Sequence, residues 1–256
     1  MKIKELIYNM KKIVTGMIFF IVSLVSYSLN FSVYPVRVDA DFQKVTTHEI
    51  TLTNNTLEPL RIEAYPEADK SFGEKYNLND KIVLFPKVVS IKPGASQKLR
   101  FRVKPDSEMK NGEYKSFITF REIPSEIKNT AKEEKSGTIT SNVRFITEIS
   151  IPVYSLGKNQ VVDGNLTNVG CKSEGNTLNL KGKSVSKGNT SLIFDYVLDV
   201  IGLDVKLTGK LGSSAREGEK DISLNITTKE SLKGKKAKLK ITDQTGKVHF
   251  NKEVTL

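Results

Sequence analysis

The stretch "SNVRFITEISIPVY", residues 141–154, alternates apolar and polar side chains in the manner of a β-strand. Its apolar face carries Val143, Phe145, Ile149, Ile151 and Val153. Apolar residues at every second position predict a half-buried strand, because successive side chains of an extended chain point to opposite faces. The pattern leaves two possibilities open for what buries this face: the protein's own core, or another protein.

Strand-like patterns fill most of the chain beyond residue 30. Turn-forming pairs such as Asn54-Asn55 and Pro93-Gly94 separate them, at spacings typical of a β-sandwich. Residues 190–202, "TSLIFDYVLDVIG", leave a helix open as an alternative, although their aromatic and β-branched content favours a strand. We predict an all-β chain with two sandwich domains, at residues 29–155 and 156–256.

The segment that precedes the quoted strand has a different composition. Residues 124–140, "PSEIKNTAKEEKSGTIT", are charged and poor in large apolar side chains. Such a segment cannot bury enough surface to offset the entropy lost on ordering, so we predict a mobile loop.

The first 28 residues have the features of a signal peptide. Four lysines precede "IVTGMIFFIVSLVSY" (13–27), and Ser26-Tyr27-Ser28 offers small residues for cleavage. An uncleaved membrane anchor is the alternative, but this apolar run is shorter than the about 20 residues that a spanning helix needs. We therefore predict export, and no stable membrane association after cleavage.

Charge and cysteine content narrow the possible functions. Cys171 is the chain's single cysteine, so in an exported protein the core alone must hold the fold. The formal net charge is +11, and loss of the leader's four lysines and Glu5 lowers it to +8. The lysines are spread through alternating segments such as 232–240, without adjacent aromatic residues or a recognition helix. This distribution is typical of solvated strand faces, and it argues against nucleic-acid binding.

The sequence offers no catalytic or metal-binding constellation. A nucleophile needs a positioned base, but the two histidines, His48 and His249, lie far apart in strand-like segments. We interpret both as ordinary strand residues. Metal-ligand spacings and glycine-rich phosphate loops are also missing. We predict a binding or structural protein that needs no metal or cofactor and is not an enzyme.

An ordered set of residues across the first half of the chain resembles the periplasmic pilus-assembly chaperones, the PapD-like family. The set includes an arginine in the first strand, a proline before an apolar strand, a Pro-Gly turn leading to an arginine, and a "REIP" sequence before a long loop. The matching residues are Arg37, Pro86, Pro93, Gly94, Arg100 and Arg121 to Pro124. The resemblance covers residues 31–154 and is weak beyond them.

The resemblance implies two immunoglobulin-like domains set at an angle, a periplasmic location, and binding to pilus or fimbrial subunits that lack their last strand. It also implies delivery of these subunits to an outer-membrane assembly platform. In that family the strand equivalent to 141–154 is lent to the subunit by donor-strand complementation. The implied donor residues are Ile139, Ser141, Val143, Phe145, Thr147 and Ile149.

The resemblance further implies that Arg37 holds the C-terminal carboxylate of the subunit, together with a lysine from the donor strand. This sequence has Ser150 at the lysine's position. Three possibilities stay open: Arg37 acts with the Ser150 hydroxyl, it acts with a lysine from elsewhere, or the subunit terminus is held differently.

An alternative function is an exported structural or adhesive immunoglobulin-like surface protein without a chaperone role. In such a protein, Val143 and Phe145 would be shielded in the isolated monomer.

Overall fold

The computed structural model describes residues 29–41, 44–104, 109, 111–124 and 145–256. The predicted signal peptide lies outside the described residues, as do residues 125–140 of the predicted loop and the donor residues Ile139, Ser141 and Val143. In the part of the chain that is described, no helix is long and apolar enough to span a bilayer.

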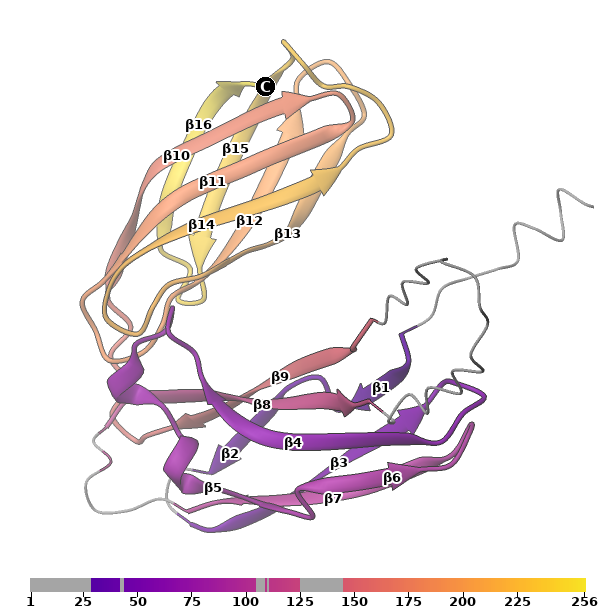
Figure 1. Ribbon diagram of the computed structural model, residues 1–256. Coiled ribbons are helices and arrows are strands. Elements are labelled where there is room, and N and C mark those ends of the chain that lie inside the picture. Colours follow the sequence, from indigo (N-terminus) through magenta and orange to yellow (C-terminus); the bar gives the residue numbers. More distant parts are fainter. Residues whose placement is uncertain (1–28, 42–43, 105–108, 110, 125–144) are drawn as a thin grey trace, which may run out of the picture.

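Two β-sheets form the first domain (Figure 1). The four-stranded sheet has the order β1 (Phe31–Tyr34), β3 (Thr46–Asn54), β7 (Ser96–Val103), β5 (Ile82–Phe85). The five-stranded sheet has the order β2 (Val38–Asp41), β9 (Glu148–Leu156), β8 (Glu113–Ile123), β4 (Leu60–Ala68), β6 (Val88–Ile91). Two short 3-10 helices, η1 (Glu74–Tyr76) and η2 (Asn79–Lys81), connect β4 to β5.

The alternation of apolar residues along these strands fills the space between the two sheets. On β7, Leu99, Phe101 and Val103 are buried, whereas the residues between them are exposed. On β8, Ile118 and Phe120 face them from the other sheet's inner side and are fully buried. Every second side chain of a strand points to the same face, so the core follows directly from the pattern in the sequence.

The second domain is also a β-sandwich. One sheet has the order β10 (Gly164–Glu174), β11 (Thr177–Ser186), β14 (Gly218–Thr227). The other has the order β13 (Lys206–Ser213), β12 (Ile193–Val200), β15 (Lys236–Asp243), β16 (Val248–Thr255). The predicted all-β fold is confirmed. Residues 193–200 form a strand, so the helical alternative for this segment is wrong.

Two polar residues of the second domain lie deeper than their sequence context suggests. His249 on β16 is a strand residue, as predicted, but its side chain is buried and its Nε2 lies 2.8 Å from Asp243 Oδ2. Burial of Asp243 opposes ionisation, and the hydrogen bonds from Thr245 and His249 outweigh it and lower the pKa of Asp243.

Cys171 is buried in the same domain, and burial raises the pKa of its thiol to about 11.

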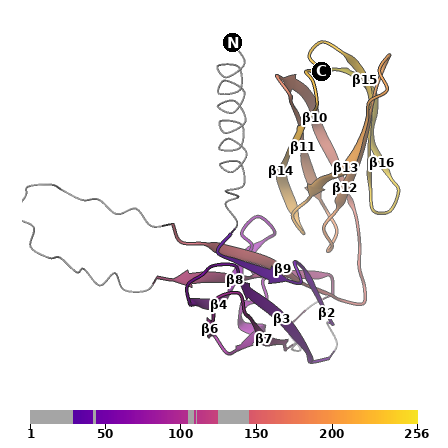
Figure 2. The same cartoon turned by 90° about the vertical axis from the view of Figure 1, so that its right-hand side faces the viewer.

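The second domain stands at an angle at one end of the first, as Figures 1 and 2 show. β9 ends at Leu156 and β10 begins at Gly164, so a short linker joins the two sandwiches. The predicted boundary between residues 155 and 156 falls at the end of β9. Where the domains meet, the backbone N–H of Glu113 donates to the carbonyl of Asn189 over 2.8 Å.

Arg216, in the segment that leads into β14, anchors the second domain on the first. Its backbone N–H donates to the Phe72 carbonyl and its Nη2 donates to the Asn111 carbonyl, over 3.1 and 2.8 Å. Its guanidinium carbon lies 3.6 Å from the ring centroid of Tyr76 and 4.9 Å from that of Tyr114. Arg216 is only 4% exposed, so these contacts are shielded from water and fix the angle between the domains.

The packing at this junction leaves no room for additional atoms. Gly112 has a φ of +104°, and a Cβ atom built there would lie 2.4 Å from the Asn189 carbonyl oxygen. Glycine is therefore required at position 112 both for its backbone conformation and for the close approach of the two domains.

Replacement of Arg216 by methionine is expected to loosen the junction. Met keeps most of the apolar stem but loses the Asn111 hydrogen bond and the cation–π contacts, so we expect the linker to open about tenfold more often. The measurement is the rate of trypsin cleavage after Lys158, an exposed residue of the linker. Lys172→Met, an exposed lysine on β10, is the control. Equal cleavage rates for Arg216→Met and wild type would show that Arg216 does not hold the domains.

Candidate functional site

The strand predicted at residues 141–154 differs in burial along its length. Ile151 and Val153 are 2% and 0% exposed and belong to the core of the first domain, against which Ile149 packs in part. Thr147 is half-buried, and its carbonyl accepts a hydrogen bond from the backbone of Glu122. Phe145 is 85% exposed. The apolar face is therefore covered by the protein at its C-terminal end and uncovered at Phe145.

One edge of β9 is open over more than half of the strand. β8 pairs with β9 from Glu148 to Leu156, but β2 pairs on the other side only from Val153 to Leu156. Within the described residues, positions 148–152 therefore have a strand neighbour on the β8 side alone. The unpaired backbone N–H and C=O groups of such an edge can accept another strand.

The open edge ends where β2 begins. β2 runs parallel to β9, with Val38 opposite Val153, and Arg37 directly precedes Val38. An added strand that runs parallel to β9 along positions 148–152 would be stopped by β2. Its C-terminal end would then lie next to Arg37.

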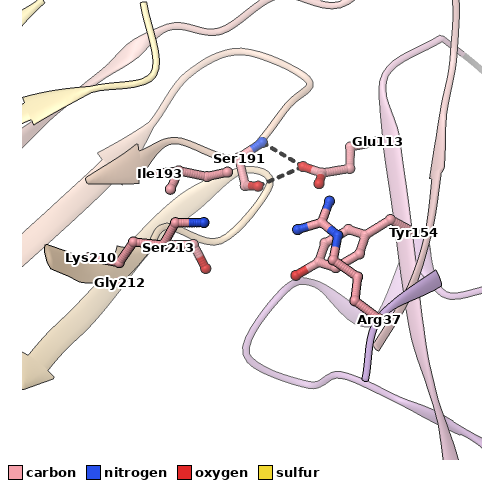
Figure 3. Close-up of a pocket in the computed structure, with 8 residues that line it drawn as sticks. All are labelled: Arg37, Glu113, Tyr154, Ser191, Ile193, Lys210, Gly212 and Ser213. Atoms are coloured by element: carbon pink, nitrogen blue, oxygen red, sulfur yellow. Dashed lines mark hydrogen bonds between the residues drawn. The ribbon is translucent and has the colours of Figure 1, made fainter. Parts of the chain in front are cut away.

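Arg37 lines a pocket of about 200 Å³ between the two domains (Figure 3). The first domain contributes side chains from the start of β2, from β8 and from β9, and the second domain contributes residues of and near β12 and β13. The lining residues are Arg37, Glu113, Tyr154, Ser191, Ile193, Lys210, Gly212 and Ser213.

Two neighbours orient the Arg37 guanidinium. Its carbon lies 4.1 Å from the centroid of the Tyr154 ring, and its Nη2 donates to Asp39 Oδ1 over 2.7 Å. The hydrogen bonds to Asp39 raise the pKa of Arg37 above its ordinary value, although partial burial acts in the opposite direction. These contacts use Nε and one hydrogen of Nη2, so among the described residues Nη1 has no hydrogen-bond acceptor. Arg37 can therefore bind a further anion.

Glu113, on β8 of the first domain, lines the pocket where the two domains meet. It is 5% exposed, and its Oε2 accepts hydrogen bonds from the backbone N–H and the hydroxyl of Ser191, over 2.8 and 2.6 Å. Figure 3 shows these two bonds crossing from one domain to the other. The carboxylate is therefore committed to the domain junction, and it contributes negative charge at one wall of the pocket.

Ser150, the other predicted anchor residue, does not line the pocket. Its hydroxyl lies 2.9 Å from the Thr119 hydroxyl, and the Thr119 hydroxyl donates to Glu67. On β9, position 150 is about 13 Å from Tyr154 at the rise of a strand. The structure brings Arg37 and Tyr154 together, but it leaves Ser150 in a separate hydrogen-bonded group.

Sequence reasoning missed Glu113, Tyr154, Ser191 and Lys210 as members of this site. Each stands in a strand or turn without a distinguishing motif, and the four come from both domains. Only the angle between the domains brings them together, so no local signal in the sequence could have identified them.

The arrangement is suited to binding. It combines an open strand edge, an exposed phenylalanine beside that edge, and a cationic pocket where the edge ends. Within the described residues there is no cluster of His, Cys, Asp and Glu side chains that could hold a metal ion. The chemistry that these groups offer is backbone pairing, burial of apolar side chains and capture of an anion.

Comparison with known proteins gives a family for the first domain. Residues 30–153 match the model of the N-terminal domain of PapD, described as a pili and flagellar-assembly chaperone. No curated protein sequence matches the chain.

Several solved structures match most of the chain. The YadV chaperone is 10% identical, with a TM-score of 0.49 over 89% of this chain and 100% of its own. The Escherichia coli chaperone DraB is 16% identical, with a TM-score of 0.46 over 88% of this chain and 96% of its own. A chain of the CsuC–CsuE chaperone–tip adhesion subunit complex of Acinetobacter baumannii is 14% identical, with a TM-score of 0.48 over 88% of this chain and 97% of its own.

The family match covers the open edge of β9, Arg37 and nearly all of the first sandwich. The resemblance predicted from the ordered residues between Arg37 and Pro124 is confirmed. The first domain of this chain therefore belongs to the family of the PapD N-terminal domain, described as a pili and flagellar-assembly chaperone.

Proposed function

We propose that this protein is a periplasmic chaperone that binds and caps pilus or fimbrial subunits by donor-strand complementation. The subunits it binds lack their last strand, and the chaperone delivers them to an outer-membrane platform for assembly into a surface fibre. The predicted signal peptide would direct the protein to the periplasm. The proposal is supported by the PapD-like first domain and by the geometry of β9.

The exposure of Phe145 is the observation that carries this proposal. A large apolar side chain that is 85% exposed is unfavourable in an isolated protein, all the more next to a strand edge that has no partner strand among the described residues. An unfinished subunit has the complementary defect, because its missing strand leaves backbone groups unpaired and its core open. Pairing the two surfaces removes both defects.

Burial of apolar side chains supplies most of the energy for this pairing. Burying Phe145 in a subunit groove would contribute about 1.5–3 kcal/mol, and each further apolar donor residue a similar amount. We assign donor positions to Ile139, Ser141, Val143, Phe145 and Thr147, which share one face of the extended chain. Ile149 packs in part on the chaperone's own core, so it stands at the transition between the lent and the retained part of the strand.

In this proposal, Arg37 binds the subunit's C-terminal carboxylate. A subunit strand that runs parallel to β9 along its open edge ends beside Arg37, because β2 occupies the edge beyond that point. The free Nη1 hydrogens of Arg37 can then donate charge-assisted hydrogen bonds to the carboxylate. The carboxylate would fix the register in which the subunit strand pairs with β9.

Phe145→Asp is expected to reduce recovery of a co-expressed subunit by about tenfold or more, because a carboxylate in an apolar groove is strongly unfavourable. The measurement is the amount of a candidate subunit, encoded by a neighbouring gene, that copurifies with the chaperone. Leu57→Asp is the matched control, since Leu57 is an apolar residue with 94% exposure that lies in the turn between β3 and β4.

Equal recovery with Phe145→Asp and Leu57→Asp would contradict the donor-strand proposal and favour a structural or adhesive surface protein. Amide hydrogen exchange gives an independent result. If the strand is lent, the amides of residues 139–146 should exchange rapidly in the free protein and slowly in the complex. Slow exchange in the isolated monomer would support the surface protein.

Arg37→Glu is expected to weaken subunit binding by about tenfold or more, because it removes a charge-assisted contact with the subunit carboxylate. The thermal stability of the free chain should stay nearly unchanged, because Arg37 is exposed. Arg61→Glu, at an exposed position on β4 of the same sheet, controls for the change in net charge. Normal binding by Arg37→Glu would remove the carboxylate anchor from the mechanism.

A further inference from the structure

We infer that Lys210 of the second domain is the second cation of the carboxylate anchor, and that it replaces the lysine that β9 lacks at Ser150. This inference rests on the proposed function, because it names the group that acts with Arg37. It makes the anchor a property of both domains: Arg37 approaches the carboxylate from the first domain and Lys210 from the second.

A β-bulge in β13 directs Lys210 toward the first domain. The register between β12 and β13 shifts after Phe194, so that Asp195 pairs with Lys210 and Phe194 pairs with Gly212. The additional residue, Leu211, turns into the core of the second domain and is 3% exposed. Bulges commonly change the direction of a neighbouring side chain, and here Lys210 and Gly212 on either side of Leu211 both line the interdomain pocket.

Gly212 permits this bulge. Its φ is +153°, and a Cβ atom at this position would lie 2.7 Å from the Ile222 side chain. A larger residue would therefore push β13 away from β14, and with it Lys210. The bulge and the glycine together fix the position of the lysine.

Lys210 is exposed and available to bind a ligand. Among the described residues it forms no ion pair, although Asp195 is its cross-strand neighbour. Figure 3 shows its amino group pointing from β13 into the space where the Arg37 guanidinium lies. The pocket lining holds two cations and one carboxylate, and Ser191 already binds that carboxylate, Glu113. Asp39 binds Arg37 through Nε and Nη2, so an incoming anion meets Nη1 of Arg37 and the amino group of Lys210 as its positively charged partners.

Lys115 is an alternative candidate for the second cation. It is the cross-strand neighbour of Tyr154, and the Arg37 guanidinium lies over the Tyr154 ring. Its Nζ, however, forms an ion pair of 2.6 Å with Asp69, and the two side chains are only 11% and 9% exposed. Burial opposes ionisation of Asp69, and the hydrogen bond from Lys115 outweighs it and lowers the pKa of Asp69. Removing Lys115 from this pair would leave a buried carboxylate without its partner, so Lys115 is committed to the structure.

The ligand that fits this pocket is the carboxylate at the end of an extended polypeptide. The open edge of β9 leads to the pocket, and β2 prevents an added strand from continuing past it. Two cations on opposite sides of the pocket can bind both oxygens of one carboxylate. The rigid junction made by Arg216 and Glu113 holds the two cations at a fixed separation, which limits the entropy lost on binding.

The test compares two peptides that share the last residues of the candidate subunit, one with a free C-terminal carboxylate and one with a C-terminal amide. Their affinities for the full-length chaperone are measured by calorimetric titration. Wild type is expected to bind the carboxylate form about tenfold more tightly than the amide form. Lys210→Met is expected to lose this preference, because the variant keeps the apolar stem and lacks the charge. Lys206→Met is the matched control: Lys206 is exposed on the same strand, about 13 Å further along at strand rise.

A preference for the carboxylate that is the same in Lys210→Met, Lys206→Met and wild type would overturn the inference. Co-expression with the subunit separates this result from failure of the proposed function. If wild type captures the subunit and Lys210→Met retains the full preference, the chaperone proposal stands and Lys210 is not the partner of Arg37. If wild type does not capture the subunit, the chaperone proposal fails, whereas a Lys210-dependent preference for the carboxylate would still establish the site. Equal binding of both peptides by wild type would overturn the inference as well.

Discussion

The pairing of the short strand β2 with only the last part of β9 is the constraint on which the rest of the site depends. The register places Val38 opposite Val153, so among the described residues no strand lies beside the backbone groups of β9 before that point on this edge. The same register places Arg37 where the open edge ends. If β2 extended further along β9, the backbone groups of this edge would be paired internally and could not accept an added strand.

The junction of the two domains is the second determinant. Arg216, sandwiched near Tyr76 and Tyr114, and the Glu113–Ser191 hydrogen bonds set the angle at which β13 faces the first sheet. That angle turns surface residues of two separate sandwiches into the walls of one pocket. If the protein binds a strand and an anion in fixed register, as we propose, a rigid junction limits the entropy lost on binding.

Sequence patterns predicted the fold well because β-sandwich cores depend on alternation. The buried residues of β7 and β9 are those that the period of two identifies. On β8 the apolar residues Tyr114, Ile118 and Phe120 follow the same period, whereas Glu113 and Thr119 are buried on the opposite face. The helical alternative for the segment of β12 was resolved by the partners it finds, β13 and β15, which local pattern does not encode. The burial of His249 against Asp243 was likewise invisible, because the two residues meet only when β15 and β16 form a hairpin.

The sequence by itself determined that the chain is all-β, that its first half resembles the pilus-assembly chaperones, and that Phe145 and Arg37 are candidate binding residues. These properties are local or are carried by the order of short motifs along the chain. Tertiary structure alone decided that Phe145 is exposed, that Ser150 lies outside the pocket and that Lys210 lines it. The reason is physical. The exposure of a residue and its distance from other residues depend on which strands pair and on the angle between the two sandwiches. Local sequence near the site does not determine the strand pairing or this angle.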